Sequence, residues 1–199
     1  MDLSTDTLDN EELLHLAVSA SQADRHDQAI SLLKQAAQRS PGDARVMHCL
    51  GAEHAQIGMY DRAIAEMSRA LELDPGLVPA RFQLGLLCLT TGQAGQAEEV
   101  LRPLADLGEG DSYRHFGAGL VSLLHDAPGA CLTSLEQGLA LGTGNPSLAA
   151  DMARLAEAVT VQMGVSLPPA GPAADPADPE PASANLWMSR YQKNGGGAQ

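Results

Sequence analysis

The stretch that decides the fold is residues 44–77, ARVMHCLGAEHAQIGMYDRAIAEMSRALELDPGL. Its apolar residues are mainly Leu, Ala, Val, Ile and Met, which suit closely spaced helices better than a β-sandwich. Pro41-Gly42-Asp43 precedes the stretch and Asp74-Pro75-Gly76 closes it, and both sequences are strong signals for a break in the chain. We therefore predict a pair of antiparallel helices bounded by turns.

The same 34-residue pattern occurs four times without an insertion, in frames that start at Asn10, Ala44, Val78 and Ser112. Small residues at the eighth and twentieth places would let the two helices of a frame approach closely, and larger residues at the twenty-fourth place would fill the gap. Because neither helix can bury its face alone, neighbouring frames must stack. The repeated residues are Ala17, Gly51, Gly85 and Gly119 at the eighth place, Ala29, Ala63, Ala97 and Cys131 at the twentieth, and Leu33, Met67, Leu101 and Leu135 at the twenty-fourth.

This pattern resembles the tetratricopeptide repeat (TPR) family over residues 10–143, most closely in the second frame. The third frame departs from it at Glu109, where proline is usual. The fourth has Cys131 and Gly138 at the two alanine places and Thr143 at the proline place. The resemblance implies an all-α, right-handed solenoid of four helix-turn-helix repeats, with protein binding as its general role. The matching residues of the second frame are Leu50, Gly51, Gly58, Tyr60, Ala63, Ala70 and Pro75.

Around the repeats, the sequence predicts an acidic lead, a capping helix, a linker and a C-terminal motif. Asp9 and Glu12 have the spacing of a capping box that opens the first helix. Six prolines between Pro168 and Pro181 prevent a packed core, so a disordered, semi-extended tail is expected. The expected boundaries are 1–9 for the lead, 10–43, 44–77, 78–111 and 112–145 for the repeats, 146–164 for the capping helix, 165–185 for the linker, and 186–199 for the motif and a flexible end.

The charge of the chain limits its partners. With 25 acidic and 12 basic residues, the net charge is −13, so nucleic acid and anionic membrane surfaces would be repelled. No stretch is long and apolar enough to suggest membrane insertion, and the acidic start lacks the features of a secretory signal. The three cysteines, Cys49, Cys88 and Cys131, indicate free thiols. We expect a cytoplasmic protein that binds an apolar or basic amphipathic segment, although the acidity could serve solubility alone.

Catalytic and metal-binding patterns are weak. The densest cluster of potential ligands is His48, Cys49, Glu53 and His54, but the two histidines are six residues apart and face different sides of a helix, whereas a helical zinc pair needs a spacing of four. The eleventh place of the frame, where His54 lies, is one at which a TPR packs a bulky side chain. We therefore predict no catalytic residue, no metal site, no cofactor and no enzyme activity.

In the TPR family, the first helix of each repeat lines a concave groove at places two, five, six, nine, twelve and thirteen. Some members grip a terminal carboxylate there with Lys, Arg and Asn, but only Arg45 could take part here. The corresponding residues are unusually apolar, and large apolar surfaces generally mark interaction sites. Alternatively, the last two frames are packed more deeply against the capping helix. The residues assigned to the groove are Leu14, Val18, His48, Ala52, Phe82, Leu86, Leu89, Tyr113, Phe116, Leu120 and Leu123.

Two hypotheses for function follow. In the first, the chain is an adaptor or chaperone that holds a peptide segment of a partner in the groove; acidic bacterial TPR chaperones of type III secretion translocators are similar, although the Pro-rich tail departs from that pattern. In the second, it is an assembly or regulatory component whose C-terminal motif docks elsewhere while the repeats form a rigid scaffold. The motif could also join two copies of the chain as a homodimer. Its residues are Leu186, Trp187, Met188, Arg190 and Tyr191.

Overall fold

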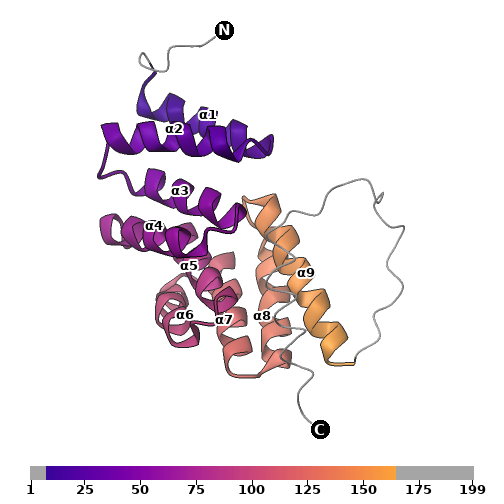
Figure 1. The fold of residues 1–199 in the computed structure, drawn as a ribbon. Coiled ribbons are helices and arrows are strands. Elements are labelled where there is room, and N and C mark those ends of the chain that lie inside the picture. The colour runs from indigo at the N-terminus through magenta and orange to yellow at the C-terminus, as the bar shows by residue number, and fades with distance from the viewer. Residues whose placement is uncertain (1–7, 165–199) are drawn as a thin grey trace. The chain divides into compact units, whose positions relative to one another are not determined.

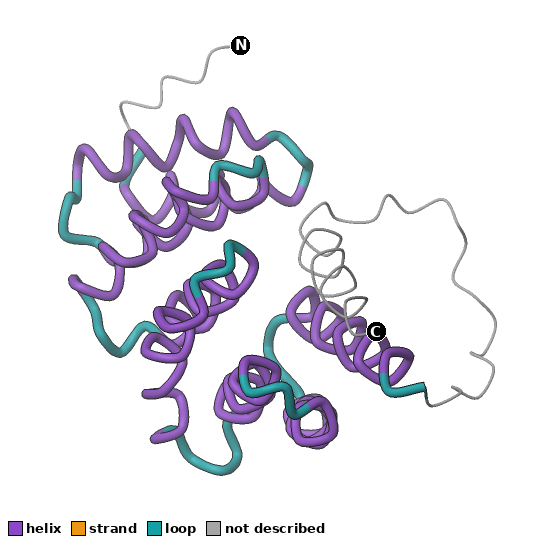
Figure 2. The backbone as a smooth tube through the Cα atoms, turned by 60° about the horizontal axis from the view of Figure 1, so that its bottom comes forward, coloured by secondary structure: helices purple, strands orange, loops and turns teal. Residues whose placement is uncertain are grey.

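The computed structural model describes residues 8–164, and within this range the regular secondary structure is entirely helical (Figure 2). The predicted all-α TPR fold is confirmed. The four odd-numbered helices α1 to α7 begin at the four frame starts. The helices are α1 (Asn10–Gln22), α2 (His26–Arg39), α3 (Ala44–Gln56), α4 (Tyr60–Leu73), α5 (Val78–Thr90), α6 (Ala94–Leu101), the 3-10 helix η2 (Arg102–Asp106), α7 (Ser112–Leu124), α8 (Pro128–Leu141) and α9 (Pro146–Gln162).

The chain divides into two compact units, residues 1–87 and 88–199, and α5 runs across the boundary. In the described part of the first unit, α1 packs against α2, α2 against α3, and α3 against α4 (Figure 1). In the second, α6 and η2 pack against α7, α7 against α8, and α8 against α9. In each unit, helices adjacent in sequence are thus neighbours in space, as expected for stacked hairpins.

The turn inside each repeat has the same backbone geometry. Its central residue has a positive φ, a conformation that glycine adopts without strain and aspartate tolerates better than most residues. The next residue donates its backbone N–H to a carbonyl five residues earlier, which closes the end of the first helix. The four turns contain Asp24 (φ 55°), Gly58 (76°), Gly92 (78°) and Asp126 (52°), with the bonds Arg25 to Ala20, Met59 to His54, Gln93 to Cys88 and Ala127 to Ser122 at 2.8–2.9 Å.

In three repeats, the first helix is capped at its N-terminus by a side chain. Asp9, Asp43 and Asp111 each accept a backbone N–H at 2.8–2.9 Å, which satisfies a donor that the helix leaves unpaired. Glu12 also accepts the backbone N–H of Asp9 at 2.8 Å, so the predicted capping box is confirmed. None of the second helices α2, α4, α6 and α8 has a side-chain cap.

The eighth place is where the two helices of a repeat meet. A Cβ atom added at Gly51 would lie 2.7 Å from Met67 Cγ and 3.1 Å from the carbonyl oxygen of Ala63. The fourth repeat has the same arrangement, because a Cβ at Gly119 would lie 3.1 Å from Leu135 Cδ2. The glycines therefore face the twentieth and twenty-fourth places, and the close approach expected from the repeat is present in both hairpins.

The second unit departs from regular repeat packing at two points. Proline lacks an N–H group and clashes with the preceding helical turn, and at Pro103 the α-helix α6 gives way to η2. Within η2, Leu104 is buried against Gly117, where an added Cβ would lie only 2.8 Å from Leu104 Cδ1. In α8, a Cβ at Gly138 would lie 2.4 Å from the ring of Phe116. Each large side chain thus occupies space that a glycine leaves open.

Candidate functional site

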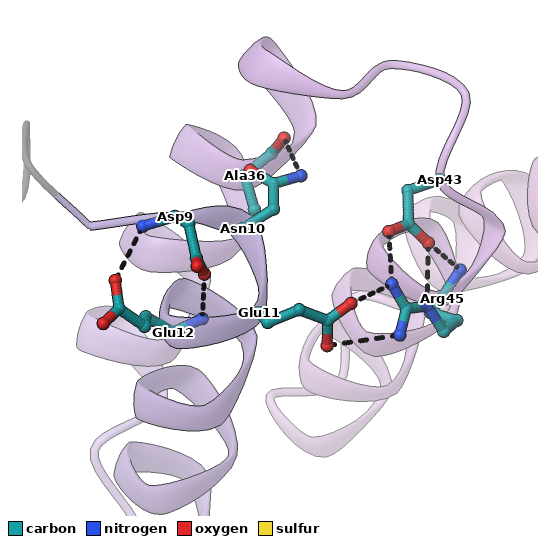
Figure 3. Close-up of polar contacts among 7 residues, drawn as sticks. All are labelled: Asp9, Asn10, Glu11, Glu12, Ala36, Asp43 and Arg45. Carbon is teal, nitrogen blue, oxygen red and sulfur yellow. Dashed lines mark hydrogen bonds and ion pairs between the residues drawn. The ribbon is translucent and has the colours of Figure 1, made fainter.

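Arg45 ties the first two repeats together on the surface formed by their first helices. Its guanidinium donates to Glu11 Oε1 at 2.6 Å and to Asp43 Oδ2 at 2.9 Å, as Figure 3 shows. Glu11 and Arg45 occupy the second place of consecutive frames, so the pair spans neighbouring repeats. The side-chain hydrogen bond from Arg45 holds the pKa of Asp43 below its usual value, and the two carboxylates raise the pKa of Arg45. Because Arg45 is engaged with both, it cannot serve as an open carboxylate clamp.

A second contact between repeats lies further along the same surface. His48 Nε2 is 2.8 Å from Gln83 Oε1, and the two residues belong to the second and third repeats. Burial lowers the pKa of His48, while the hydrogen bond to Gln83 opposes the shift. A neutral imidazole that donates to the amide oxygen fits this geometry. Neighbouring Cys49 is half-buried, and desolvation raises the pKa of its thiol to about 11, so it is a weak nucleophile at neutral pH.

The structure places the predicted groove residues at very different depths. Only Val18, with 44% of its surface exposed, is open to solvent. Leu14, Phe82, Phe116 and Leu120 are buried. The half-buried residues are His48, Ala52, Leu86, Leu89, Tyr113 and Leu123. The predicted motif residues Leu186, Trp187, Met188, Arg190 and Tyr191 lie outside the described residues.

Phe116 shows that the place of a residue in the repeat does not by itself predict how far its side chain is exposed to solvent. The ring is fully buried and packs against Gly138 of α8, within its own repeat. The burial of Phe116 agrees with the alternative of deeper packing in the last frames, but the contact described here is with α8 and not with the capping helix α9. The signal was present in the sequence, since the twenty-seventh place is Ala36 and Ala70 in the first two frames but Gly138 in the fourth.

Two histidine–glutamate pairs, each with one buried and one half-buried member, were not anticipated from the sequence. His26 Nδ1 lies 2.9 Å from Glu53 Oε2 and joins α2 to α3. His54, which is almost fully buried, lies 2.5 Å from Glu66 of α4. The sequence placed His54 at a packing position but gave no sign of its carboxylate partner. These pairs explain how polar side chains can lie between helices, because each has a hydrogen-bonding partner.

The chemistry of the remaining groups is limited. Burial raises the pKa of Cys131 to about 12 and also raises the pKa of Cys88. Among residues 8–164, no three His, Cys, Asp or Glu side chains gather in a way that could hold a metal ion. None of the helices described is long and apolar enough to span a membrane.

Comparison with known proteins supports the repeat assignment. Residues 55–115 match the family described as Tetratricopeptide repeat. The chain is similar to Protein SGT1 homolog from Oryza sativa subsp. japonica, with 29% identity over 45% of this chain and 24% of that protein. It is also similar to the Peroxisomal targeting signal receptor of Candida albicans, with 30% identity over 48% of this chain and 16% of that protein. The matches span about a quarter or less of these two relatives.

Among solved structures, the chain resembles TTC0263, a thermophilic TPR protein of Thermus thermophilus. The TM-score is 0.65 at 21% identity, over 78% of this chain and 84% of the other. At this level of identity, the similarity concerns the fold. Residues 55–115 thus match the tetratricopeptide repeat family, and the common turn geometry and the structural similarity show that the described residues have the TPR fold.

Proposed function

We propose that the chain is a non-enzymatic adaptor or chaperone that holds an apolar, basic segment of a partner protein. The contact surface is the A face, defined as the exposed and half-buried residues Glu11, Val18, Arg45, His48, Ala52 and Gln83. All six lie in the first unit, on α1, α3 and the first part of α5. The observation that carries the proposal is the pair of bonds, Glu11–Arg45 and His48–Gln83, that connect consecutive repeats across this face.

These bonds hold the face in a fixed arrangement before a partner arrives. A surface whose side chains are already ordered loses less conformational entropy on binding. Val18 and Ala52 occupy the ninth place of consecutive frames and provide apolar contact area. The buried residues Leu14 and Phe82 lie at the fifth place and support the face from beneath.

The charge of the A face favours a basic partner. Arg45 is shared between Glu11 and Asp43, so this group of three side chains has a net negative charge. The chain as a whole has a net charge of −13. Complementary charge would speed the encounter and reject acidic segments. The name of one relative, a targeting signal receptor, is consistent with peptide binding as the shared role.

The test uses two designed helical peptides, one with a Leu stripe flanked by Lys and one with the same stripe flanked by Glu. The Leu/Lys peptide should bind the full chain, measured by calorimetry, and Ala52→Arg should weaken it at least about tenfold, or about 1.4 kcal/mol. The reason is that arginine adds bulk and positive charge at the centre of the A face. Ala65→Arg is the matched control, since Ala65 is exposed on α4.

Equal binding of the Leu/Glu peptide would contradict the charge argument. An affinity unchanged by Ala52→Arg would move the contact away from the A face. The alternative function, a scaffold that docks through its C-terminal motif, would show neither peptide binding to the A face nor sensitivity to Ala52.

A further inference from the structure

The outer side of α1 is a helix-packing surface without a helix on it in the described structure. The seventh-place leucine of the second repeat, Leu50, is only 4% exposed and belongs to one hydrophobic cluster with Leu32, Leu33 and Ala36 of α2. The equivalent residue of the first repeat, Leu16, is 40% exposed. In the second repeat, the amphipathic helix α2 covers the seventh-place leucine. A helix of the same kind therefore fits the corresponding surface around Leu16.

The surface around Leu16 is hollowed. A depression of about 530 Å³, here called the α1 hollow, is lined by Leu8, Glu11, Glu12, His15 and Leu16. Glu12 and Leu16 lie on one row along α1, Glu11 and His15 lie on the next, and Leu8 precedes the helix. Two such neighbouring rows form the groove into which a second helix packs its side chains.

The rim of the α1 hollow is acidic. Glu11 and Glu12 lie in the first turn of α1, directly after Asp9. Arg45 offsets part of this charge through its bond with Glu11, whereas Glu12 accepts only the backbone N–H of Asp9 among the bonds described here. An occupant should therefore combine an apolar stripe with positive charge.

One segment of this chain has that composition. Residues 186–193, LWMSRYQK, carry Arg190 and Lys193, which are the only positive charges after Arg154, and no acidic residue follows Glu180. On a helix, Trp187 and Tyr191 would share a face because they are four residues apart. The intervening linker of about 20 residues has a reach of roughly 25 Å, and more where prolines extend it. A tether of this length that spans two sites gives an effective concentration in the millimolar range, enough for a weak contact.

We propose that residues 186–193 dock on the α1 hollow of the same chain or of a second copy. Trp187 and Tyr191 cover Leu8 and Leu16, and Arg190 lies near the acidic rim. The contact goes beyond the proposed function, because it shares only Glu11 with the A face and uses the outer side of α1 rather than Val18 and Ala52.

The fluorescence of the full-length chain tests this contact, since Trp187 is the only tryptophan. In the unchanged protein, Trp187 should emit at shorter wavelength than a solvated indole and be protected from acrylamide. Leu16→Glu places a charge in the hollow and should abolish both effects. Ile57→Glu is the matched control, because Ile57 is also 40% exposed but lies at the end of α3; it should leave the emission unchanged.

A second variant excludes the possibility that Leu16→Glu exposes Trp187 only by disturbing the folding of α1. Arg190→Glu with Lys193→Glu leaves the repeats untouched and should also expose Trp187, because it replaces attraction to Glu12 by repulsion. Emission of a fully solvated indole in the unchanged protein would overturn the proposal. Protection that survives both Leu16→Glu and the double charge reversal would overturn it as well, since the tail would then dock elsewhere.

Discussion

The second and fourth repeats differ in the use they make of their fifth place. In the second, His48 is half-buried and bonds to Gln83 of the next repeat. In the fourth, Phe116 turns into its own hairpin and packs on Gly138. Gly138 at the twenty-seventh place leaves room for the ring in the fourth repeat, whereas the second repeat has Ala70 at that place. A residue at the same place of the repeat can therefore serve the surface in one hairpin and the core in another.

The largest expected effect comes from removing the fifth-place side chain in each repeat. Phe116→Ala should destabilise the protein by about 3–5 kcal/mol, because a fully buried aromatic ring leaves a cavity. His48→Ala should cost about 1 kcal/mol, since a single hydrogen bond of a half-buried side chain is lost. Urea unfolding monitored by circular dichroism measures both. Equal costs would show that the two residues do not differ in role.

A smaller effect should follow from filling the space beside Phe116. Gly138→Ala places a methyl group 2.4 Å from the Phe116 ring, so we expect a cost of about 1–3 kcal/mol, partly offset by the higher helix propensity of alanine. Adding Phe116→Leu to Gly138→Ala should recover part of the loss, because the smaller side chain vacates the contact. If the free-energy costs of Gly138→Ala and Phe116→Leu simply added in the double variant, the two side chains would not compensate for each other in volume.

The smallest effect compares the eighth-place glycines. Gly51→Ala meets a backbone oxygen at 3.1 Å and Met67 Cγ at 2.7 Å, whereas Gly119→Ala meets Leu135 at 3.1 Å. We expect Gly51→Ala to destabilise by about 1 kcal/mol and Gly119→Ala to be close to neutral, because helix propensity offsets the looser contact. Thermal unfolding of the two variants gives the comparison. The reverse order would mean that the second hairpin is the less tightly packed of the two.

The repeat pattern carried most of the information on the fold. The frame starts predicted from the sequence coincide with the starts of α1, α3, α5 and α7, because small residues at fixed places dictate which helix faces can touch. The break at Pro103 was not predicted, although proline inside a helical pattern is a physical signal for it.

The candidate site was less accessible to prediction. Arg45 was recognised as the one cation of the predicted groove, but its partners Glu11 and Asp43 depend on side-chain orientation and on the stacking of repeats. The same holds for His54, whose carboxylate partner comes from the other helix of the hairpin. Periodicity predicts which residues share a face, whereas the pairing of polar side chains depends on distances that only the folded chain defines.

The turns within repeats and the joints between them respond differently to acid. The turn at Asp24 is closed by backbone groups, which do not titrate. The joint at Asp43 depends on an ionised carboxylate that caps α3 and binds Arg45. Since the pKa of Asp43 is lowered below 3.8, its stabilising contribution is complete above that pH and is lost as the pH falls through the lowered value. Acid should therefore weaken the cap of α3 and its bond to Arg45, whereas the backbone bond that closes the turn at Asp24 is unaffected.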